Sequence, residues 1–406
     1  MNDFRSAISQ QFFRRILIGI LGATAVRAND EAALPKDIAR EVVEAEIGPK
    51  SGDLPILERW DEARVKLKKN IGLSWTASYH SLGLAAAGGD GVPAGASGDL
   101  TVQGIWTPGQ RWVENPTELR FRFRDRRAYG ATSASGVSNE VGALWGVVDG
   151  FSDSGFEVPD FYLRHVFDRP GIDLRYGQMA IDSQFGGHQF SSSKKYFLNQ
   201  AFSSDPAVAF PRFGAGLTIE KSFDNGLAVG VGATTVQGTT AGDQVDFKFN
   251  SSDLFEVLQL SYDLKDGENP PQRFVLLGWH SDGLEDVSQP AGQGAQFIYE
   301  RALDEDGARL VSSVAWSSGG AAPLDLFFNF GVGMPWRDRD TIGVAAGIGR
   351  GSGPDGTVQS VVEGFYRWQP LKNLQVTPDV QLLLGEGLEG APGVRVIGGI
   401  RLGLSF

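Results

Sequence analysis

From residue 70 onward, apolar and polar residues alternate with a period of two in short segments. The period is that of a β-strand with one face in an apolar medium and the other in a polar one. Gly, Asp, Asn and Pro separate the segments, and stretches of about ten residues give about 16 strands, an even number as bacterial barrels require. The clearest segments are 71–79, 119–124, 217–220, 227–232, 258–263, 324–330, 374–382 and 394–406.

Alternation also occurs in soluble sandwiches, so further features are needed to choose between the two folds. Many apolar faces begin or end in Trp or Tyr, as the aromatic girdles of membrane barrels do, and the opposite faces carry glycines and charges that suit a wet lumen. The last strand ends on Phe406, a residue of the kind that the outer-membrane assembly machinery reads. Lipid offers no partner to backbone N–H groups, so a spanning sheet must close. The sequence predicts an all-β, transmembrane antiparallel barrel over residues 70–406, in contact with outer-membrane lipid.

The first 69 residues have a different character. Arginines precede the apolar stretch 16–26, and small residues around Ala28 are typical of signal-peptide cleavage, so residues 1–28 are predicted to be an export signal. An amphipathic N-terminal helix is the alternative. Residues 29–69 are predicted to be a periplasmic segment, helical over 36–47 and 57–67. Export would place the barrel in the outer membrane of a Gram-negative cell.

Composition excludes several classes of function. The 406 residues include 54 glycines, no cysteine and four histidines, and the net charge is −12. Thiolate chemistry is impossible, and an acidic chain is a poor binder of nucleic acid. The sequence lacks a Walker loop, an H-E-x-x-H pair and a G-x-S-x-G elbow, and 347–351 (GIGRG) lies in a strand pattern. We expect no enzymatic activity, cofactor or metal.

Two blocks of sequence resemble the carbohydrate-selective porins of the OprB family. One runs from GIDLRYGQMAI (171–181) into SSKKYFLNQAFSSDP (192–206), where YFLNQAF is the closest match. The other is EGFYRWQP (363–370) followed by LQVTPDVQLLL (374–384). The resemblance implies a monomeric or trimeric barrel through which sugars diffuse down a gradient. The Gly/Ala-rich stretch 88–98 departs from the family pattern.

A sugar-selective constriction needs hydrogen-bonding groups around the pore. The parity of 119–124 places three arginines on the lumen side, as a ladder of guanidinium donors, and the same parity places Arg175 there. An arginine that faced lipid would cost about 2–4 kcal/mol, so this register is strongly preferred. The ladder could select substrate or only stiffen the wall, with Glu220, Glu363 and Asp379 as candidate counter-charges. The full candidate set is Arg120, Arg122, Arg124, Arg175, Tyr196, Glu220, Glu363, Arg367 and Asp379.

Residues 182–213 interrupt the alternation and are too long for a hairpin turn. We expect this segment to fold into the barrel and narrow it, with Tyr196 as a stacking face or an anchor; an outward surface loop is the alternative. The sequence therefore predicts passive diffusion of carbohydrates. A general or small-acid-selective porin, a barrel-embedded hydrolase and a secreted polysaccharide-binding or lyase sandwich are the other hypotheses.

Overall fold

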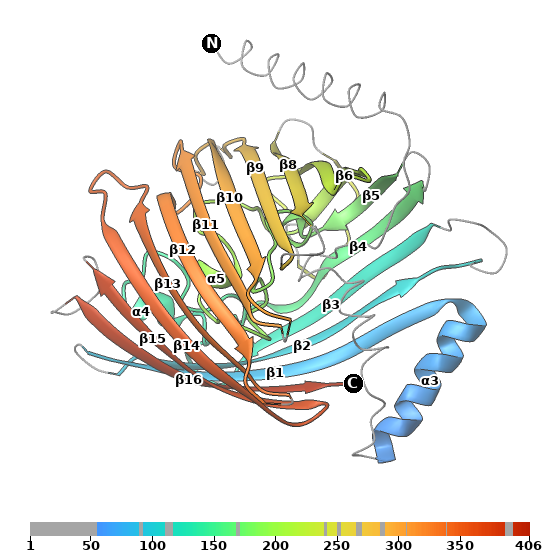
Figure 1. Ribbon diagram of the computed structural model, residues 1–406, viewed down its shortest axis with the longest axis horizontal. Helices are drawn as coiled ribbons and strands as arrows, with labels where there is room; N and C mark the ends of the chain where they lie inside the picture. Colours follow the sequence, from blue (N-terminus) through green and yellow to red (C-terminus); the bar gives the residue numbers. More distant parts are fainter. Residues whose placement is uncertain are drawn as a thin grey trace, which may run out of the picture.

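The structure is a computed structural model that describes residues 55–406 except 89–91, 110–116, 168–170, 239–241, 250–252, 265–269, 285–288, 306, 338 and 386–392. In this part of the chain, sixteen antiparallel strands form one closed barrel, in which β1 pairs with both β2 and β16 (Figure 1). The strand count and the closure predicted from the alternation are confirmed. The predicted export signal and the predicted helix over 36–47 lie outside the described residues.

The elements follow one another around the barrel in chain order. One helix, α3 (Pro55–Ile71), precedes the first strand and contains the segment 57–67. The strands are β1 (Leu73–Ala87), β2 (Ala94–Trp106), β3 (Glu118–Ala128), β4 (Gly155–Phe167), β5 (Ile172–Met179), β6 (Gly214–Ser222), β7 (Leu227–Thr235), β8 (Leu254–Leu264), β9 (Gln272–Ser281), β10 (Gly292–Ala302), β11 (Arg309–Ser318), β12 (Leu324–Pro335), β13 (Thr341–Gly351), β14 (Val358–Leu371), β15 (Leu374–Gly385) and β16 (Val394–Ser405). Short helices in the connections are α4 (Val137–Glu140), η1 (Ile181–Ser183) and α5 (Gln200–Ser203).

Outward side chains form an apolar surface around the barrel. On this face the exposed fraction reaches 62% for Val344 on β13 and 58% for Ile400 on β16, whereas most of the intervening residues are buried. A closed sheet satisfies its backbone hydrogen bonds internally and can present such a surface to lipid. Over the described residues, no helix has the length and apolar character needed to cross a membrane.

The connections at the two ends of the barrel differ in length. At the end that carries α3 and Phe406, β14 and β15 are joined by residues 372–373 and β6 and β7 by 223–226. The two longest connections, 129–154 and 180–213, are at the opposite end. Short turns on the periplasmic side and long extracellular loops are the rule for outer-membrane barrels, which orients the molecule.

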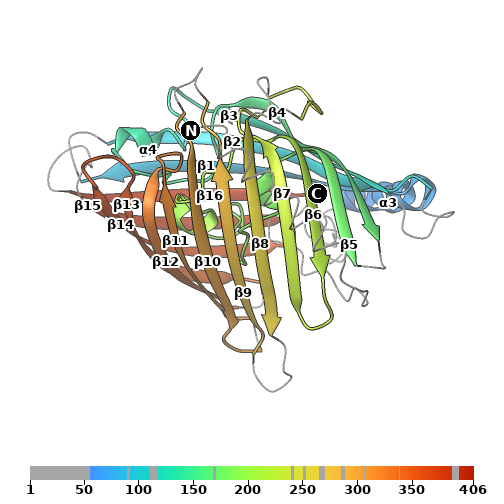
Figure 2. The same ribbon diagram turned by 90° about the horizontal axis from the view of Figure 1, so that it is seen from above.

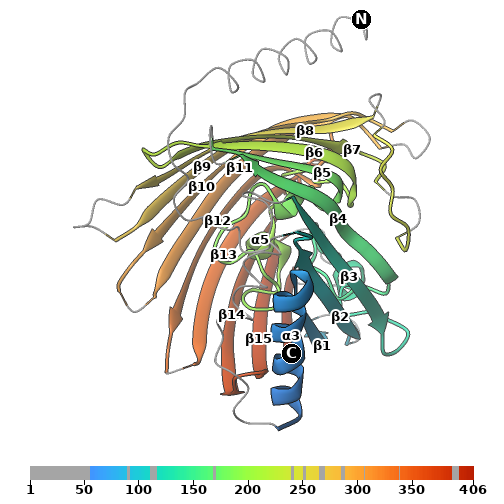
Figure 3. The same ribbon diagram turned by 90° about the vertical axis from the view of Figure 1, so that its right-hand side faces the viewer.

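Both of these long connections fold into the barrel, and the ring of strands encloses α5 (Figures 2 and 3). They bury a cluster of apolar side chains against the inner face of β9–β16. The alternation alone suggests a wet lumen, but this half of the interior is packed with apolar side chains. Inner glycines make the room: a Cβ on Gly343 would lie 2.4 Å from Phe365 and 3.0 Å from Phe197. The loop side chains of this cluster include Val137, Val141, Trp145, Val147, Phe151, Phe190, Phe197, Leu198 and Phe202.

Candidate functional site

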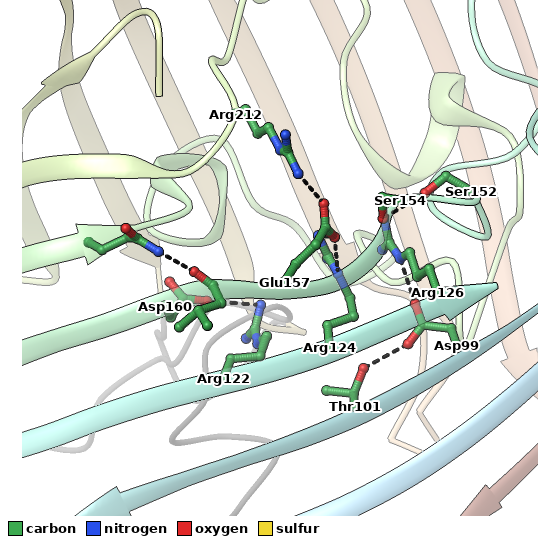
Figure 4. A network of polar contacts seen from close by, with 12 residues as sticks. Asp99, Thr101, Arg122, Arg124, Arg126, Ser152, Ser154, Glu157, Asp160 and Arg212 are labelled. Atoms are coloured by element: carbon green, nitrogen blue, oxygen red, sulfur yellow. Dashed lines mark hydrogen bonds and ion pairs between the residues drawn. The ribbon is translucent and has the colours of Figure 1, made fainter. Parts of the chain in front are cut away.

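Three arginines of β3, Arg122, Arg124 and Arg126, line a polar part of the interior (Figure 4). Arg120, Arg122 and Arg124 share the inner face, as their parity predicted, and Arg126 extends the row toward the extracellular end. The row runs along one strand, so its guanidinium groups are spaced along the length of that strand.

Carboxylates on the neighbouring strands hold these guanidinium groups. Arg122 Nη1 lies 3.4 Å from Asp160 Oδ2, and Arg124 Nη2 lies 2.8 Å from Glu157 Oε2. Arg126 Nε lies 2.8 Å from Asp99 Oδ2 on β2. The side chains of Asp99 and Asp160 have no exposed surface, so the cations face the lumen and the anions stand behind them.

A β-bulge in β4 brings two of these carboxylates to the same face. Asp160 pairs with Arg122 and Glu157 with Arg124, so three steps along β4 match two steps along β3. A bulge inserts one residue and shifts the alternation by one position; here Pro159 lies in it. Strict alternation places Glu157 and Asp160 on opposite faces, which is why sequence analysis did not identify them as counter-charges.

The loop 180–213 supplies the facing wall and two further cations. Lys194 Nζ lies 2.7 Å from Asp99 Oδ1 and donates to the Thr101 hydroxyl at 2.6 Å. Arg212 Nη2 lies 2.5 Å from Glu157 Oε1 (Figure 4). Asp99 and Glu157 are thus each shared between a strand arginine and a loop cation, which ties the loop to the ladder.

Between the ladder and the loop lies a cavity of about 460 Å³. This volume is within the range of about 300–1,000 Å³ typical of small-molecule sites. Its polar lining contains both hydrogen-bond donors and acceptors, and serine and threonine side chains supply many hydroxyl groups. The lining includes Thr101, Gln103, Arg122, Arg124, Arg126, Asp149, Asp182, Ser183, Ser191, Ser192, Ser193, Lys194, Ser204, Asp205 and Arg212.

The formal charges at this cavity nearly balance. The five cations are Arg122, Arg124, Arg126, Lys194 and Arg212, and the six carboxyl groups paired with them or lining the same space are Asp99, Asp149, Glu157, Asp160, Asp182 and Asp205. The charges cancel when Asp205 is protonated and sum to −1 when it is ionised. A wall of this kind offers hydrogen bonds of both polarities without a large net field.

Asp205 adds a titratable group to the lining. It lies in the inward loop, where its carboxylate accepts from the Ala207 N–H at 2.9 Å and from Gln296 Nε2 at 2.8 Å. Burial raises the pKa of Asp205 to about 7. Near neutral pH, this carboxyl therefore exists in both charged and uncharged forms.

Glu363 on β14 and Asp379 on β15 lie beneath the loop 180–213. Both carboxylate oxygens of Glu363 accept backbone hydrogen bonds, from Leu198 N at 2.5 Å and from Asn199 N at 3.0 Å. Asp379 accepts from Gln381 Nε2 at 3.4 Å, and it is 2% exposed. These acids are within the packed half of the barrel, and their described contacts place them in the attachment of the loop.

Tyr196 and Arg367 belong to the same attachment. The guanidinium of Arg367 lies 5.6 Å from the centre of the Tyr196 ring and donates to the Lys195 carbonyl at 3.1 Å. Arg401 donates to the carbonyls of Ser193 and Tyr196. Asn199 caps α5 through Ala201 N and accepts from the Trp145 indole at 2.8 Å, which joins the two inward loops. Most of the YFLNQAF motif therefore holds the loop in place.

Arg120 and Arg175 belong to a second charged group nearer the periplasmic end. Arg120 Nη2 lies 2.9 Å from Glu118 Oε2, and Arg175 Nη2 lies 2.6 Å from Asp173 Oδ2. Glu220 is opposite Asp173 in the register of β5 and β6. This group lies along the same wall, beyond the cavity lining.

The described residues contain no group of three or more His, Asp or Glu side chains placed to hold a metal ion.

Solved structures with the same architecture are outer-membrane porins. The high-pH structure of Pseudomonas putida OprB matches with a TM-score of 0.70 and 13% identity, over 86% of this chain and 97% of that one. Salmonella typhi OmpF in complex with daunomycin matches at 0.55 and 11%, over 84% and 99%. The anion-selective porin from Comamonas acidovorans matches at 0.53 and 9%, over 82% and 99%. No family model and no curated protein sequence matches the chain. At these identities the likeness establishes the fold, which is that of a 16-stranded porin barrel.

Proposed function

We propose that this chain is an outer-membrane porin through which small carbohydrates diffuse. The observation that carries the proposal is the ion-paired arginine ladder facing a hydroxyl-rich cavity of about 460 Å³. Arg122, Arg124 and Arg126 are each held by a carboxylate and line the cavity with 12%, 18% and 16% of the side chain exposed, and guanidinium groups are suited to recognition of ring hydroxyls. The inward loops fill much of the rest of the interior with apolar side chains.

Charge balance favours uncharged solutes over ions at this site. A sugar exchanges its hydrogen bonds with water for bonds to guanidinium, carboxylate and serine groups, and it brings no charge to be neutralised. An ion gains little from a wall whose cations and anions cancel. The two sequence blocks that resemble the carbohydrate-selective porins of the OprB family, together with the fold shared with Pseudomonas putida OprB, support a carbohydrate as the solute.

A small-acid-selective porin is the second candidate. Asp99 and Glu157 each serve two cations, and the cationic side chains are the more exposed members: 23% for Lys194 and 46% for Arg212. An anion that approached these groups would meet positive charge first. The fold of the anion-selective porin from Comamonas acidovorans is compatible with this function as well.

The location follows from the same proposal. An apolar outer surface on a closed barrel fits an outer membrane, reached after export through the periplasm. Phe406 pairs with β1 through the Phe406 N–H and the Ala77 carbonyl at 2.8 Å, so the terminal strand that the assembly machinery would read ends at the seam of the barrel.

The test is conductance of the purified full-length chain in planar bilayers. We expect open channels with a reversal potential near zero in a salt gradient, and a current reduced by neutral sugars. A strongly anion-selective current that small acids block and sugars do not would favour the second candidate. Absence of any channel would overturn both.

The double variant Arg122→Ala/Arg124→Ala tests the ladder. We expect sugar block to weaken by about tenfold, because two charge-assisted donors are lost. Arg350→Ala is the matched control, since Arg350 also pairs with a carboxylate at 2.8 Å, that of Asp325, but is on the outer face of the barrel. Heat-modifiable migration on gels reports folding of each variant. Unchanged sugar block in a folded double variant would limit the ladder to a structural role.

A further inference from the structure

The wall of the barrel has a gap beside the ladder. β4 and β5 pair from Phe167 and Ile172 as far as Phe161 and Gln178, and β5 ends at Met179, where the chain turns inward. Residues 155–160 of β4 continue beyond this point without a β5 partner. Glu157, which holds Arg124 and Arg212, lies in this stretch, which pairs with β3 but not with β5.

A segment of the β7–β8 connection covers the gap from outside the barrel. We name residues 242–249 the strap. The Val158 N–H donates to the Gly242 carbonyl at 2.8 Å, and Tyr176 on the outer face of β5 donates from its hydroxyl to the Phe247 carbonyl at 3.3 Å. The Phe247 ring lies 6.2 Å from that of Phe161. Val245, Phe247 and Phe249 are 39%, 45% and 39% exposed, as suits a surface against lipid.

Gln178 joins the strap to the wall. Its Oε1 accepts from Asp246 N at 2.7 Å, and its Nε2 donates to the carbonyl of Gln244 at 3.0 Å and to that of Val158. The side chain has no exposed surface although it shares its face of the barrel with outward residues. One amide thus binds the strap on one side and the edge of β4 on the other.

The strap also reaches the pore. A Cβ on Gly242 would lie 2.7 Å from Arg212 Nη2 and 3.3 Å from Glu157 Cγ. The backbone next to Glu157 is held by Gly242, and the space for the Arg212–Glu157 pair exists because residue 242 has no side chain.

We propose that Gln178 and Gly242 are positioning residues for the Arg124–Glu157–Arg212 group, so that part of the selectivity of the pore is set from its lipid-facing side. The inference rests on the proposed channel function but not on the identity of the solute. Release of the strap lets the edge of β4 move, which changes how fully Glu157 is neutralised by its two arginines.

The experiment measures the cation-to-anion permeability ratio of Gln178→Leu and Gly242→Val by reversal potential. Both variants should shift the ratio toward cations by about twofold or more, because Glu157 loses part of its cationic shielding. Gln244→Ala is the matched control, since the strap uses only the backbone carbonyl of Gln244. Heat-modifiable migration confirms folding.

A double-variant cycle separates positioning from general destabilisation. In the background Glu157→Gln, Gln178→Leu should produce no further shift, since the carboxylate through which it acts is absent. An equal shift in both backgrounds, or no shift in the folded single variants, would overturn the inference. A wild-type chain that does not conduct would refute the proposed function instead. In that case, hydrogen exchange still decides: protection of the Val158 amide should fall in Gln178→Leu, and unchanged protection would reject the role of the strap.

Discussion

At the scale of single residues, the site is defined by the ion pairs between its cationic side chains and its buried carboxylates. A buried carboxylate that serves two cations is costly to leave alone, because removal of one partner exposes the desolvation penalty of the other. Asp99 illustrates this, since it has no exposed side-chain surface and binds both Arg126 and Lys194. The arrangement fixes the loop and the ladder relative to each other.

The pH dependence of the channel should reflect Asp205. The pKa of Asp205 is raised from 3.8 to about 7, so its carboxyl is mostly uncharged at pH 6 and mostly ionised at pH 8. We expect the permeability ratio to shift toward cations as the pH rises across this interval. Asp205→Asn should remove that part of the shift, which reversal potentials at the two pH values will show. The same slope in Asp205→Asn would assign the titration to another group.

The Asp205 carboxyl also makes the stability of the folded chain depend on pH. Between pH 3.8 and about 7, the folded chain holds a proton at Asp205 that the unfolded chain has lost. The contribution of Asp205 to stability therefore decreases as the pH rises through this range. Gln296 Oε1 is buried without a hydrogen-bond partner, and an amide flip would let it accept from a protonated Asp205.

The alternation of a strand predicts which face of the barrel a single residue occupies only where the strand is regular. It places the guanidinium groups of β3 on the inner face, where the structure has them. It fails at Leu324: strict alternation over the segment 324–330 places it on the outer face with Leu326, but the register of β12 and β13 shifts between these two residues. Leu324 is fully buried and points inward. No pattern in a single sequence marks such a shift in advance.

At the scale of elements, the inward loops decide the shape of the pore. The sequence indicates that residues 182–213 are not a hairpin turn, because the alternation stops there. It gives no comparable sign for 129–154, whose apolar residues Trp145, Val147 and Phe151 fill the interior. The loss of alternation predicts that a loop exists. It does not predict where the loop packs, because that depends on contacts with residues distant in sequence.

The attachment of the loop can be tested at Glu363. Glu363→Gln replaces one of two acceptor oxygens by an amide donor that faces a backbone N–H, so one hydrogen bond is lost and a donor is buried. We expect the loop to be released part of the time, with larger and noisier single-channel conductance. Asp325→Asn on the outer face is the control. Wild-type conductance in Glu363→Gln would show that the packed aromatic residues hold the loop without it.

At the scale of the whole molecule, closure joins the two ends of the chain. β1 and β16 pair over ten residues, from Ser78 with Ser405 to Ala87 with Val396. Beside this seam, Trp60 of α3 contacts Trp75 and Phe406, with ring centres 4.9 and 6.4 Å apart. The alternation predicts a barrel, but it does not predict where α3 packs.

Trp60→Ala should therefore weaken the seam. The loss of aromatic contacts of this kind costs about 0.5–1.5 kcal/mol each beyond buried area. We expect the temperature at which the folded band disappears on unboiled gels to decrease. Val65→Ala is the control, because Val65 on the same helix is 66% exposed. An equal decrease in both variants would attribute the effect to the helix rather than to its aromatic contact.

The bulge in β4 has a consequence for evolution of the chain. If one residue between Glu157 and Asp160 were deleted, one of these acids would turn toward the hydrocarbon, and an arginine of β3 would lose its partner. In relatives of this protein, the number of residues between Glu157 and Asp160 should therefore be conserved more strictly than the identities of those residues. An ungapped alignment to a chain with a regular strand here would equate a pore residue with a lipid-facing one.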